Sequence, residues 1–178
     1  MKEEILQSAL QIAQRDGWNQ VTTRRITKEF GYTTSAIYYY LGGKDELLTE
    51  LQRQGFTQLK TRMQSAANAY PDKPEAQLMA ISSAFWEFAH TNRSLYELMF
   101  GLAAVTCNGL STGEVQQAGA VVQNVLGKLS SAPVMSLFLN WWALVSGFVA
   151  ISFSSSGEWG RHVPESFLAG VDRFIESI

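Results

Sequence analysis

Residues 20–48 read QVTTRRITKEFGYTTSAIYYYLGGKDELL, and the capping residues in this stretch predict two short helices joined by a tight turn. Thr22 or Thr23 can cap the first helix, because a hydroxyl oxygen accepts a hydrogen bond from a free amide of the first turn. Gly31 is the residue best able to adopt the left-handed conformation that ends this helix. Thr33 then caps the second helix at once. Two short helices separated by a glycine turn predict a helix-turn-helix.

The second short helix has a polar outer side. The side chains expected to point outward are Thr34, Ser35, Tyr38 and Tyr39. Ala36, Ile37 and Tyr40 are expected to pack inward against the rest of the motif. Short hydroxyl side chains at the start of a helix, followed by tyrosines one turn later, suit a helix whose first turn enters the major groove of DNA. The pattern therefore predicts double-stranded DNA as a partner.

Positive charge is concentrated in this motif. The formal net charge of the chain is −2, which is unusual for a protein that coats nucleic acid without preference. Residues 20–44 contain four basic side chains and one acidic side chain, Glu29, whereas residues 61–178 contain six basic and nine acidic side chains. A local positive field on an acidic body is what a DNA-reading module requires.

The rest of the chain also predicts helices. Apolar residues recur at helical spacing in residues 3–16, and a long helix is expected from residue 44 to about residue 68. Further helices are expected over residues 74–91, 94–104, 112–131, 133–154 and 164–177. No segment alternates apolar and polar residues long enough to predict a strand. With 46% apolar residues in 178, the chain has ample material for a core. We expect an all-α protein with a three-helix head over residues 1–50 and a helical bundle over residues 51–178.

Cysteine content and the N-terminal residues favour a cytoplasmic location. The single cysteine, Cys107, excludes an internal disulfide, and we interpret it as a buried thiol. No basic start and apolar run of a signal peptide opens the chain. Residues 129–157 carry no charge and are long enough to span a bilayer. A helix buried between its own domain and a second subunit explains the same composition, so we expect no membrane partner.

An enzyme is the alternative class, because residues 109–113 match the Gly-x-Ser-x-Gly pattern of a hydrolase nucleophile. That serine must follow a strand, and none is predicted before it. The two histidines, His90 and His162, lack the α/β sheet that such a triad requires. No cluster has the spacing of metal ligands, and no glycine-rich loop follows a strand. We therefore expect no catalysis, no metal and no cofactor.

From Ile5 to Leu51 the sequence resembles the tetracycline-repressor (TetR) family of bacterial transcriptional regulators. The resemblance lies in the spacing of Thr22-Thr23-Arg24, Gly31, Tyr38-Tyr39-Tyr40-Leu41 and Gly43-Lys44-Asp45-Glu46-Leu47-Leu48. Two departures are visible: Tyr40 and Leu41 stand where the family usually has His and Phe, and Thr27 stands where it usually has Ala. We expect these positions to face inward, so the departures concern packing and not DNA binding.

The resemblance implies roles for the residues of the head. Arg24 looks like the residue that reaches a base edge, where a guanidinium grips guanine with two hydrogen bonds. Thr23, Tyr38 and Lys44 look like phosphate contacts, and Lys44 also opens a helix whose amides favour an anion. The other candidates for contact with bases, sugar or the DNA backbone are Thr33, Thr34, Ser35 and Tyr39.

The body resembles one C-terminal subclass of the family, in which a His precedes the Gly of a Trp-His-Gly motif. This chain has Ser146 at that position, so a role of the His is not carried over. The residues that could line an apolar ligand pocket are Phe85, Phe88, Tyr96, Met99, Phe100, Trp141, Trp142 and Ser146. Aromatic residues at helical spacing are more often core. A regulator with no small-molecule effector, whose body dimerises or recruits a protein, is the alternative.

The last two predicted helices are the expected dimer interface, over residues 133–154 and 164–178, as the resemblance implies. A stripe of small or short polar residues runs along the first of them: Ser136, Asn140, Ala143, Gly147, Ala150 and Ser154. A bulky stripe lies beside it: Leu137, Trp141, Leu144, Phe148 and Ile151. We expect the small stripe to face a second subunit and the bulky stripe to face the core. The alternative is that the small stripe packs within its own subunit.

The resulting hypothesis is a homodimeric repressor of a palindromic operator, released by a small apolar or aromatic ligand.

Overall fold

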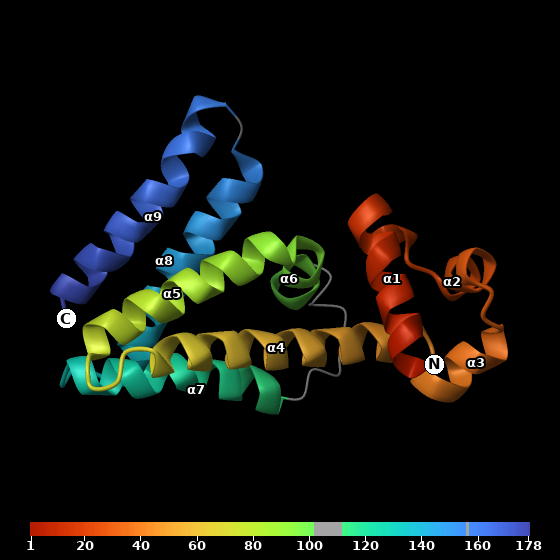
Figure 1. Cartoon of the computed structure of the whole chain (residues 1–178), viewed down its shortest axis with the longest axis horizontal. Helices are drawn as coiled ribbons and strands as arrows, with labels where there is room; N and C mark the ends of the chain where they lie inside the picture. Colours follow the sequence, from red (N-terminus) through yellow and green to blue (C-terminus); the bar gives the residue numbers. More distant parts are fainter. Residues whose placement is uncertain (102–111, 156) are drawn as a thin grey trace. The chain divides into compact units, whose positions relative to one another are not determined.

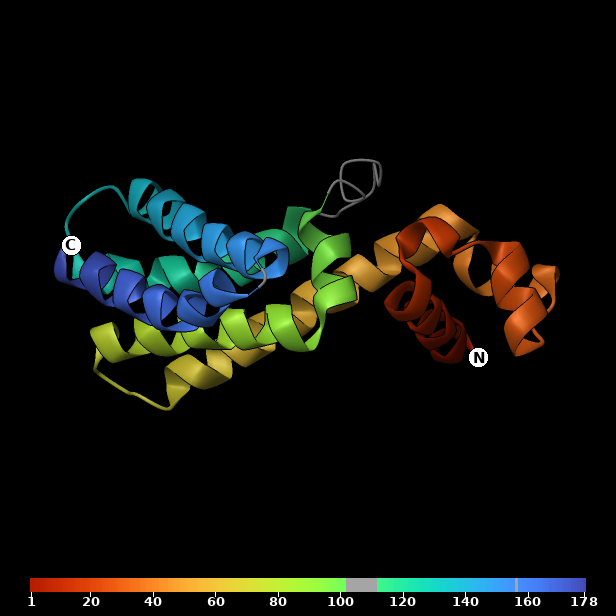
Figure 2. The ribbon, with the colours of Figure 1, turned by 90° about the horizontal axis from the view of Figure 1, so that it is seen from above.

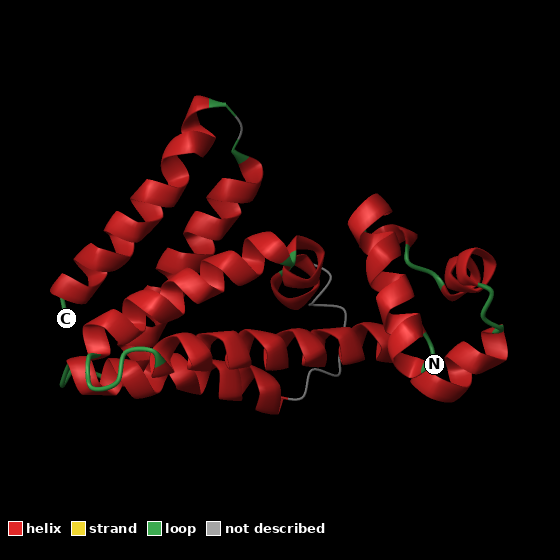
Figure 3. Ribbon diagram, viewed as in Figure 1, coloured by secondary structure: helices red, strands yellow, loops and turns green. Residues whose placement is uncertain are grey.

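The computed structural model describes residues 1–101, 112–155 and 157–178, and these residues form helices and the turns between them (Figure 3). No strand occurs among them, so the all-α prediction is confirmed. Cys107 and residues 109–111 of the Gly-x-Ser-x-Gly match lie outside the described residues. Thr112 and Gly113 of that match already belong to a helix.

The chain divides into two compact units. The first comprises residues 1–57 together with 91–114, and the second comprises residues 58–90 together with 115–178. One long helix, α4 (Lys44–Asn68), runs from the first unit into the second (Figure 1).

The first unit contains α1 (Lys2–Asp16), a short 3₁₀ turn (Trp18–Gln20), α2 (Thr23–Phe30), α3 (Thr34–Leu41), the start of α4, and α6 (Arg93–Phe100). Its core is made of aliphatic side chains spaced at helical intervals. The largest of its fully buried side chains are Ile5, Leu6, Ile12, Ile26, Ile37, Leu47 and Leu51.

Helix α6 is fixed to the rest of the first unit by two side-chain hydrogen bonds. The indole Nε1 of Trp18 donates to the Ser94 carbonyl at 2.7 Å. The side-chain amide of Gln52 in α4 donates to the Leu98 carbonyl at 2.8 Å. Hydrogen bonds between residues distant in sequence therefore hold this unit together.

The second unit contains the rest of α4, α5 (Pro74–Thr91), α7 (Thr112–Leu129), α8 (Val134–Ser154) and α9 (Glu158–Glu176). Helices α8 and α9 form a hairpin (Figure 2). A Cβ added at Gly170 in α9 would lie 3.0 Å from the ring of Phe148, so the glycine allows α8 and α9 to approach closely. In the core, the indole of Trp141 donates to the Ser82 hydroxyl at 2.9 Å and joins α8 to α5.

Helix boundaries agree with the prediction in most places. The helix over residues 74–91 is confirmed as predicted. Helix α6 ends at Phe100, and the residues after 101 of the predicted 94–104 helix lie outside the described part. Helix α9 begins at Glu158, so the predicted start at residue 164 is wrong. Pro164 lies inside the helix; its fixed φ is compatible with α geometry, but it removes one backbone hydrogen bond and its ring crowds the carbonyl four residues before it.

One part of the predicted bulky stripe on α8 is also wrong. Ile151 is 48% exposed and does not face the core. The buried positions of α8 run in steps of four through Trp141, Val145 and Val149. Ile151 follows Val149 by two residues, which is about 200° around the helix, and so points to the opposite side.

Candidate nucleic-acid interface

Two side-chain caps and one left-handed glycine build the helix-turn-helix. The Thr22 hydroxyl accepts from the Arg25 amide at 3.1 Å and begins α2, so Thr22 and not Thr23 is the cap. The Thr33 hydroxyl accepts from the Ala36 amide at 3.1 Å and begins α3. Gly31 ends α2 with a φ of 75°, in the left-handed region that glycine adopts without strain. These local interactions fix both ends of the turn.

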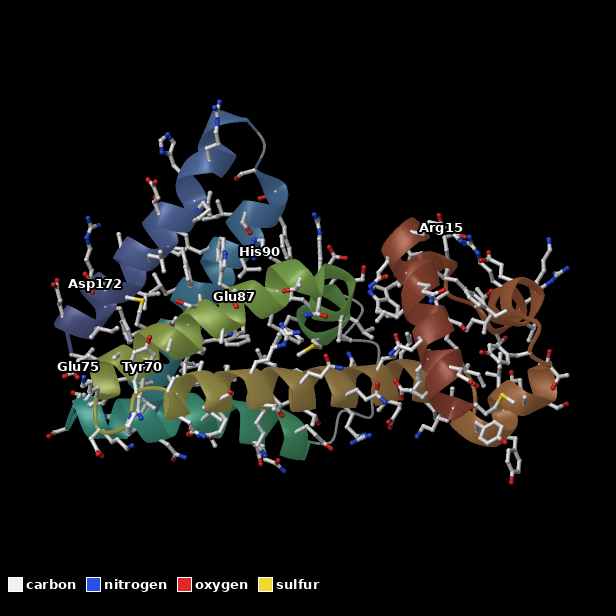
Figure 4. All side chains as sticks on the ribbon, in the orientation of Figure 1. Arg15, Tyr70, Glu75, Glu87, His90 and Asp172 are labelled. Carbon is white, nitrogen blue, oxygen red and sulfur yellow. The ribbon has the colours of Figure 1, made fainter. Side chains whose placement is uncertain are left out.

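Four charged residues tie α2 to the end of α1, where Figure 4 labels Arg15. Glu29 accepts from Arg15 at 2.7 Å and from Arg25 at 2.6 Å. Asp16 pairs with the same two guanidinium groups, with Arg15 at 2.8 Å. The Arg15 and Arg25 guanidiniums hold the pKa of Glu29 below its usual range, and Arg15 above all lowers the pKa of Asp16. We call these four residues the ion cluster.

The salt bridges of the ion cluster occupy one basic residue of α2, whereas other basic residues of the head remain available to a ligand. Arg25 is engaged by two carboxylates, and its side chain is 27% exposed. Within the described residues, Arg24, Lys28 and Lys44 take part in no salt bridge. Arg24 and Lys28 are exposed, and Lys44 is partly exposed. The one acidic residue of the motif, Glu29, is neutralised by two arginines.

Helix α3 projects its polar side outward, as predicted. Thr34 and Ser35 are exposed, Tyr38 is 55% exposed and Tyr39 is 83% exposed. The expectation that Tyr40 packs inward is wrong, since its side chain is 42% exposed. Its ring meets Tyr39 edge to face, with centroids 4.9 Å apart. An eight-residue helix buries one narrow face, and Ile37 and Leu41 occupy it.

The ring of Tyr38 lies against the backbone that begins α4. A Cβ added at Gly43 would lie 3.4 Å from Cε1 of Tyr38, and the φ of Gly43 is 141°. The ring therefore sits beside Gly43, the residue before Lys44, and glycine adopts this φ without strain. A phenol, an ammonium group and the free amides of a helix start are suited to bind one phosphate group.

All eight predicted DNA contacts belong to the first unit. Thr23 and Arg24 lie in the first turn of α2, and Lys44 lies in the first turn of α4. The remaining five belong to α3 or to its cap: Thr33, Thr34, Ser35, Tyr38 and Tyr39. Thr23 and Lys44 are partly exposed, and the other six are exposed.

The residues predicted to bind a ligand fall into two groups. In the second unit, the ring of Phe85 meets those of Trp141 at 5.9 Å and Trp142 at 5.6 Å. Phe88 is fully buried, and the Ser146 hydroxyl donates to the Trp142 carbonyl. Figure 4 labels Glu87 and His90 on α5, the helix that carries Phe85 and Phe88.

The other three predicted ligand residues belong to α6 in the first unit. The rings of Tyr96 and Phe100 lie 4.9 Å apart, and Phe100 also meets Phe56 at 5.3 Å. Met99 is 3% exposed. Burial raises the pKa of Tyr96 to about 12.

A groove of about 420 Å³ lies on the second unit between the end of α4 and α5. Its floor is made of alanines: Ala66, Ala69, Ala76, Ala80 and Ala84. Tyr70, Met79, Ser83 and Glu87 complete it, and Figure 4 labels Tyr70 and Glu87. None of the predicted ligand residues lines this groove.

Two family models match the chain. The model described as "Bacterial regulatory proteins, tetR family" matches residues 5–51. The model described as "Tetracyclin repressor-like, C-terminal domain" matches residues 78–174, which is more than half of the chain. The chain belongs to the TetR family. The helix-turn-helix of this TetR protein therefore lies where the sequence predicts it.

Individual relatives are distant. The HTH-type transcriptional regulator BetI of Vibrio atlanticus (strain LGP32) is 30% identical over 87 residues, which are 48% of this chain and 44% of BetI. The chain spans about half the length of the curated relatives it matches. A protein of unknown function from Rhodococcus sp. RHA1 has a TM-score of 0.82 at 18% identity, over 99% of this chain and 94% of that one.

The TetR family regulator PfmR from Thermus thermophilus has a TM-score of 0.73 at 14% identity, over 98% of this chain and 95% of PfmR. At these identities, the likeness to the solved structures concerns the fold alone.

Sequence reasoning missed two features of this TetR protein. The ion cluster joins residues nine and fourteen positions apart, Arg25 with Asp16 and Arg15 with Glu29, and no local pattern announces such pairs. The groove lined by alanines carries no chemical signal in the sequence, because an alanine side chain has no polar or titratable group. A run of alanines at every fourth position of α5, Ala76, Ala80 and Ala84, was the one available hint.

Proposed function

We propose that this chain is a homodimeric transcriptional repressor that binds a palindromic operator and leaves it when a small apolar or aromatic ligand binds the body. Family membership supports transcription regulation. The observation that carries DNA binding is the surface of the first unit, where exposed hydroxyls and cations on α2, α3 and α4 surround a capped helix-turn-helix. The protein is proposed to act in the cytoplasm.

Each candidate contact has a proposed role. Arg24 is exposed and outside the ion cluster, so its guanidinium is available to a guanine in the major groove. Thr23, Tyr38 and Lys44 hold phosphates and set the register of the head on DNA. The side chains proposed to contact bases, sugars or the backbone from α3 are Thr33, Thr34, Ser35 and Tyr39.

The proposed dimer interface is the outer face of α8 and α9. Among its exposed apolar side chains, Met135 and Leu139 are each 56% exposed and Leu168 is 47% exposed. The small stripe of α8 is also exposed: Ser136, Asn140, Ala143, Ala150 and Ser154. The alternative, in which this stripe packs within its own subunit, has no support among the described residues. A two-fold dimer covers the same face on both copies.

A membrane is the other environment that would cover α8. By length and composition this helix could cross a bilayer, and 22% of its most apolar window is buried. Helix α8 nevertheless packs on α9, and the family match continues through α9 to residue 174. A second copy of the chain would cover the exposed face of α8 without separating α9 from α8. We therefore propose no membrane contact.

Dimerisation links ligand binding to operator binding. A palindromic operator requires the two copies of α3 to lie roughly 34–36 Å, or a multiple of it, apart. A ligand that binds better to a dimer with another head spacing lowers operator affinity by the same free energy. We propose that this ligand is apolar, because Phe85, Trp141 and Trp142 dominate the predicted lining.

The second candidate is a regulator of the same family with no small-molecule effector. It is favoured by the complete burial of Phe85, Phe88 and Trp141, which pack as a core. The proposed Trp-His-Gly subclass does not decide between them, since Ser146 replaces the His and bonds to its own helix. Mass spectrometry of the purified protein separates the candidates. A co-purified organic molecule supports the sensor, and its absence together with tight operator binding supports the second candidate.

Selection of bound duplexes from a random DNA library, with the full-length protein, tests DNA binding. We expect enrichment of an inverted repeat with half-site centres about one helical turn apart or a multiple of it. Enrichment of a single half-site would contradict the dimeric arrangement. Recovery of no sequence above background would contradict the proposed function.

A further inference from the structure

The DNA-facing side of α2 extends beyond the predicted contacts. Helix α2 carries Arg24, Arg25 and Lys28 within five residues, and the structure gives these cations different surroundings. Arg25 belongs to the ion cluster, whereas Lys28 is exposed and takes part in no salt bridge among the described residues.

Helical geometry puts Lys28 on the same side of α2 as Arg24. Four residues advance a helix by about 6 Å and rotate it by about 40° relative to the starting position. Arg25 lies about 100° from Arg24 and points to the end of α1, where it meets Asp16. Ile26, about 200° from Arg24, is 1% exposed and faces the core. The outer edge of α2 therefore consists of Arg24 and Lys28.

We propose that Lys28 is a phosphate contact of the operator complex, one helical turn behind Arg24. The proposal rests on the proposed DNA binding. In a helix-turn-helix the first helix crosses the phosphate backbone while the second lies in the major groove. The major groove is about 12 Å wide, so a side chain about 6 Å behind a base-reading Arg24 lies level with the backbone that borders the groove. The flexible Lys28 ammonium is a point charge suited to a phosphate.

The ion cluster has a positioning role in this arrangement. Asp16 and Glu29 hold Arg25 away from the DNA-facing edge and join α2 to α1. Because Glu29 is paired with two arginines, its carboxylate does not cancel the field of Lys28 one residue before it. Residues 24–29 thus contain two pairs with different roles. Arg24 and Lys28 face the DNA, and Arg25 and Glu29 belong to the ion cluster.

The test is the salt dependence of DNA binding by full-length Lys28→Gln. Each phosphate contact contributes about 0.9 to the slope of log K against log salt concentration. Loss of two contacts in a dimer should flatten the slope by about 1.8, which corresponds to about 60-fold weaker binding at 0.1 M salt. The loss should be the same for the selected operator and for random duplex, because a phosphate contact does not read sequence.

Three variants serve as controls. Lys28→Arg keeps the charge and should keep the slope. Lys128→Gln removes an equivalent exposed cation from α7 and should leave the slope unchanged. Arg25→Gln should weaken the attachment of α2 to α1, seen as a lower unfolding midpoint, before it changes the slope.

Two results would overturn the proposal while the proposed function stands: an unchanged slope in Lys28→Gln, or a loss confined to the selected operator. If the wild-type protein binds neither duplex, the proposed function fails with it. Circular dichroism of Lys28→Gln, whose side chain is exposed, checks that the head stays folded.

Discussion

Replacement of Gly147 by leucine separates the stability of the subunit from that of the dimer. Gly147 lies in the small stripe of α8, and a Cβ added to it meets no described atom within 4 Å. Within one subunit the leucine should therefore fit. It should also strengthen the helix, because glycine in a helix interior is about 1 kcal/mol less favourable than a good helix former.

In the dimer the same substitution should be unfavourable. If the small stripe allows two copies of α8 to approach closely, a leucine at Gly147 overpacks the interface at two symmetry-related positions. Overpacking costs about 1–3 kcal/mol at each position, or about 2–6 kcal/mol for the dimer. Since about 1.4 kcal/mol is a factor of ten, the dimer should dissociate about 30-fold to 20,000-fold more readily.

Sedimentation from nanomolar to micromolar concentration measures the dimer, and thermal unfolding followed by circular dichroism measures the subunit. We expect Gly147→Leu to sediment as a folded monomer where the wild-type protein is a dimer, and to lose operator affinity in parallel. Gly127→Leu is the control, because Gly127 is an exposed glycine of α7 whose added Cβ would lie 3.6 Å from Val134. A folded Gly147→Leu protein that stays a tight dimer at micromolar concentration and binds its operator would refute the interface.

Three further predictions concern the head. Arg24→Ala should weaken operator binding by about 1–3 kcal/mol and relax base preference at one operator position. Lys44→Ala should instead weaken binding to all duplexes alike and flatten the salt slope by about 0.9 per head. Equal loss of specificity in binding titrations of both variants would contradict these roles. Thr33→Ala removes the cap of α3 and should lower the free energy of unfolding by about 0.5–2 kcal/mol in urea titrations, and an unchanged midpoint would show that the cap is dispensable. Because the pKa values of Asp16 and Glu29 are lowered in the folded protein, their stabilising contribution should be complete above about pH 5 and decline as pH falls below about 4. The Glu29→Gln variant should therefore lose less stability on acidification than the wild-type protein. An equal loss in both proteins would exclude the ion cluster as the source of the pH dependence.

The fold of the head could be predicted because its signals are local. The Thr33 cap and the Gly31 turn depend on residues within one helical turn of each other, so a short window of sequence contains the whole interaction. The helix over residues 74–91 was predictable for the same reason, with apolar side chains at helical spacing and a proline at its start. Local signals also placed the predicted DNA contacts at exposed or partly exposed positions of α2, α3 and the start of α4.

Features set by contacts between distant residues could not be predicted. Tyr40 and Ile151 are both apolar or aromatic residues beside truly buried positions, and only the packing of neighbouring helices decides that they are exposed. The predicted ligand residues illustrate the same limit. Aromatic residues at helical spacing have the same sequence pattern in a pocket and in a core, and Phe85 and Trp141 are fully buried.

Arg24 and Arg25 show how much of the proposed DNA surface depends on tertiary structure. The two residues are chemically identical neighbours on one exposed helix, and a count of basic residues treats them alike. Arg25 pairs with Glu29 one turn later in α2 and with Asp16 at the end of α1, whereas Arg24 takes part in no salt bridge among the described residues. Had α1 ended one turn earlier, Asp16 would be absent from this position, and Glu29 alone would hold Arg25 away from the DNA-facing edge. The pairing of Arg25 thus limits the number of phosphates that α2 can neutralise, and the salt slope measures that number directly.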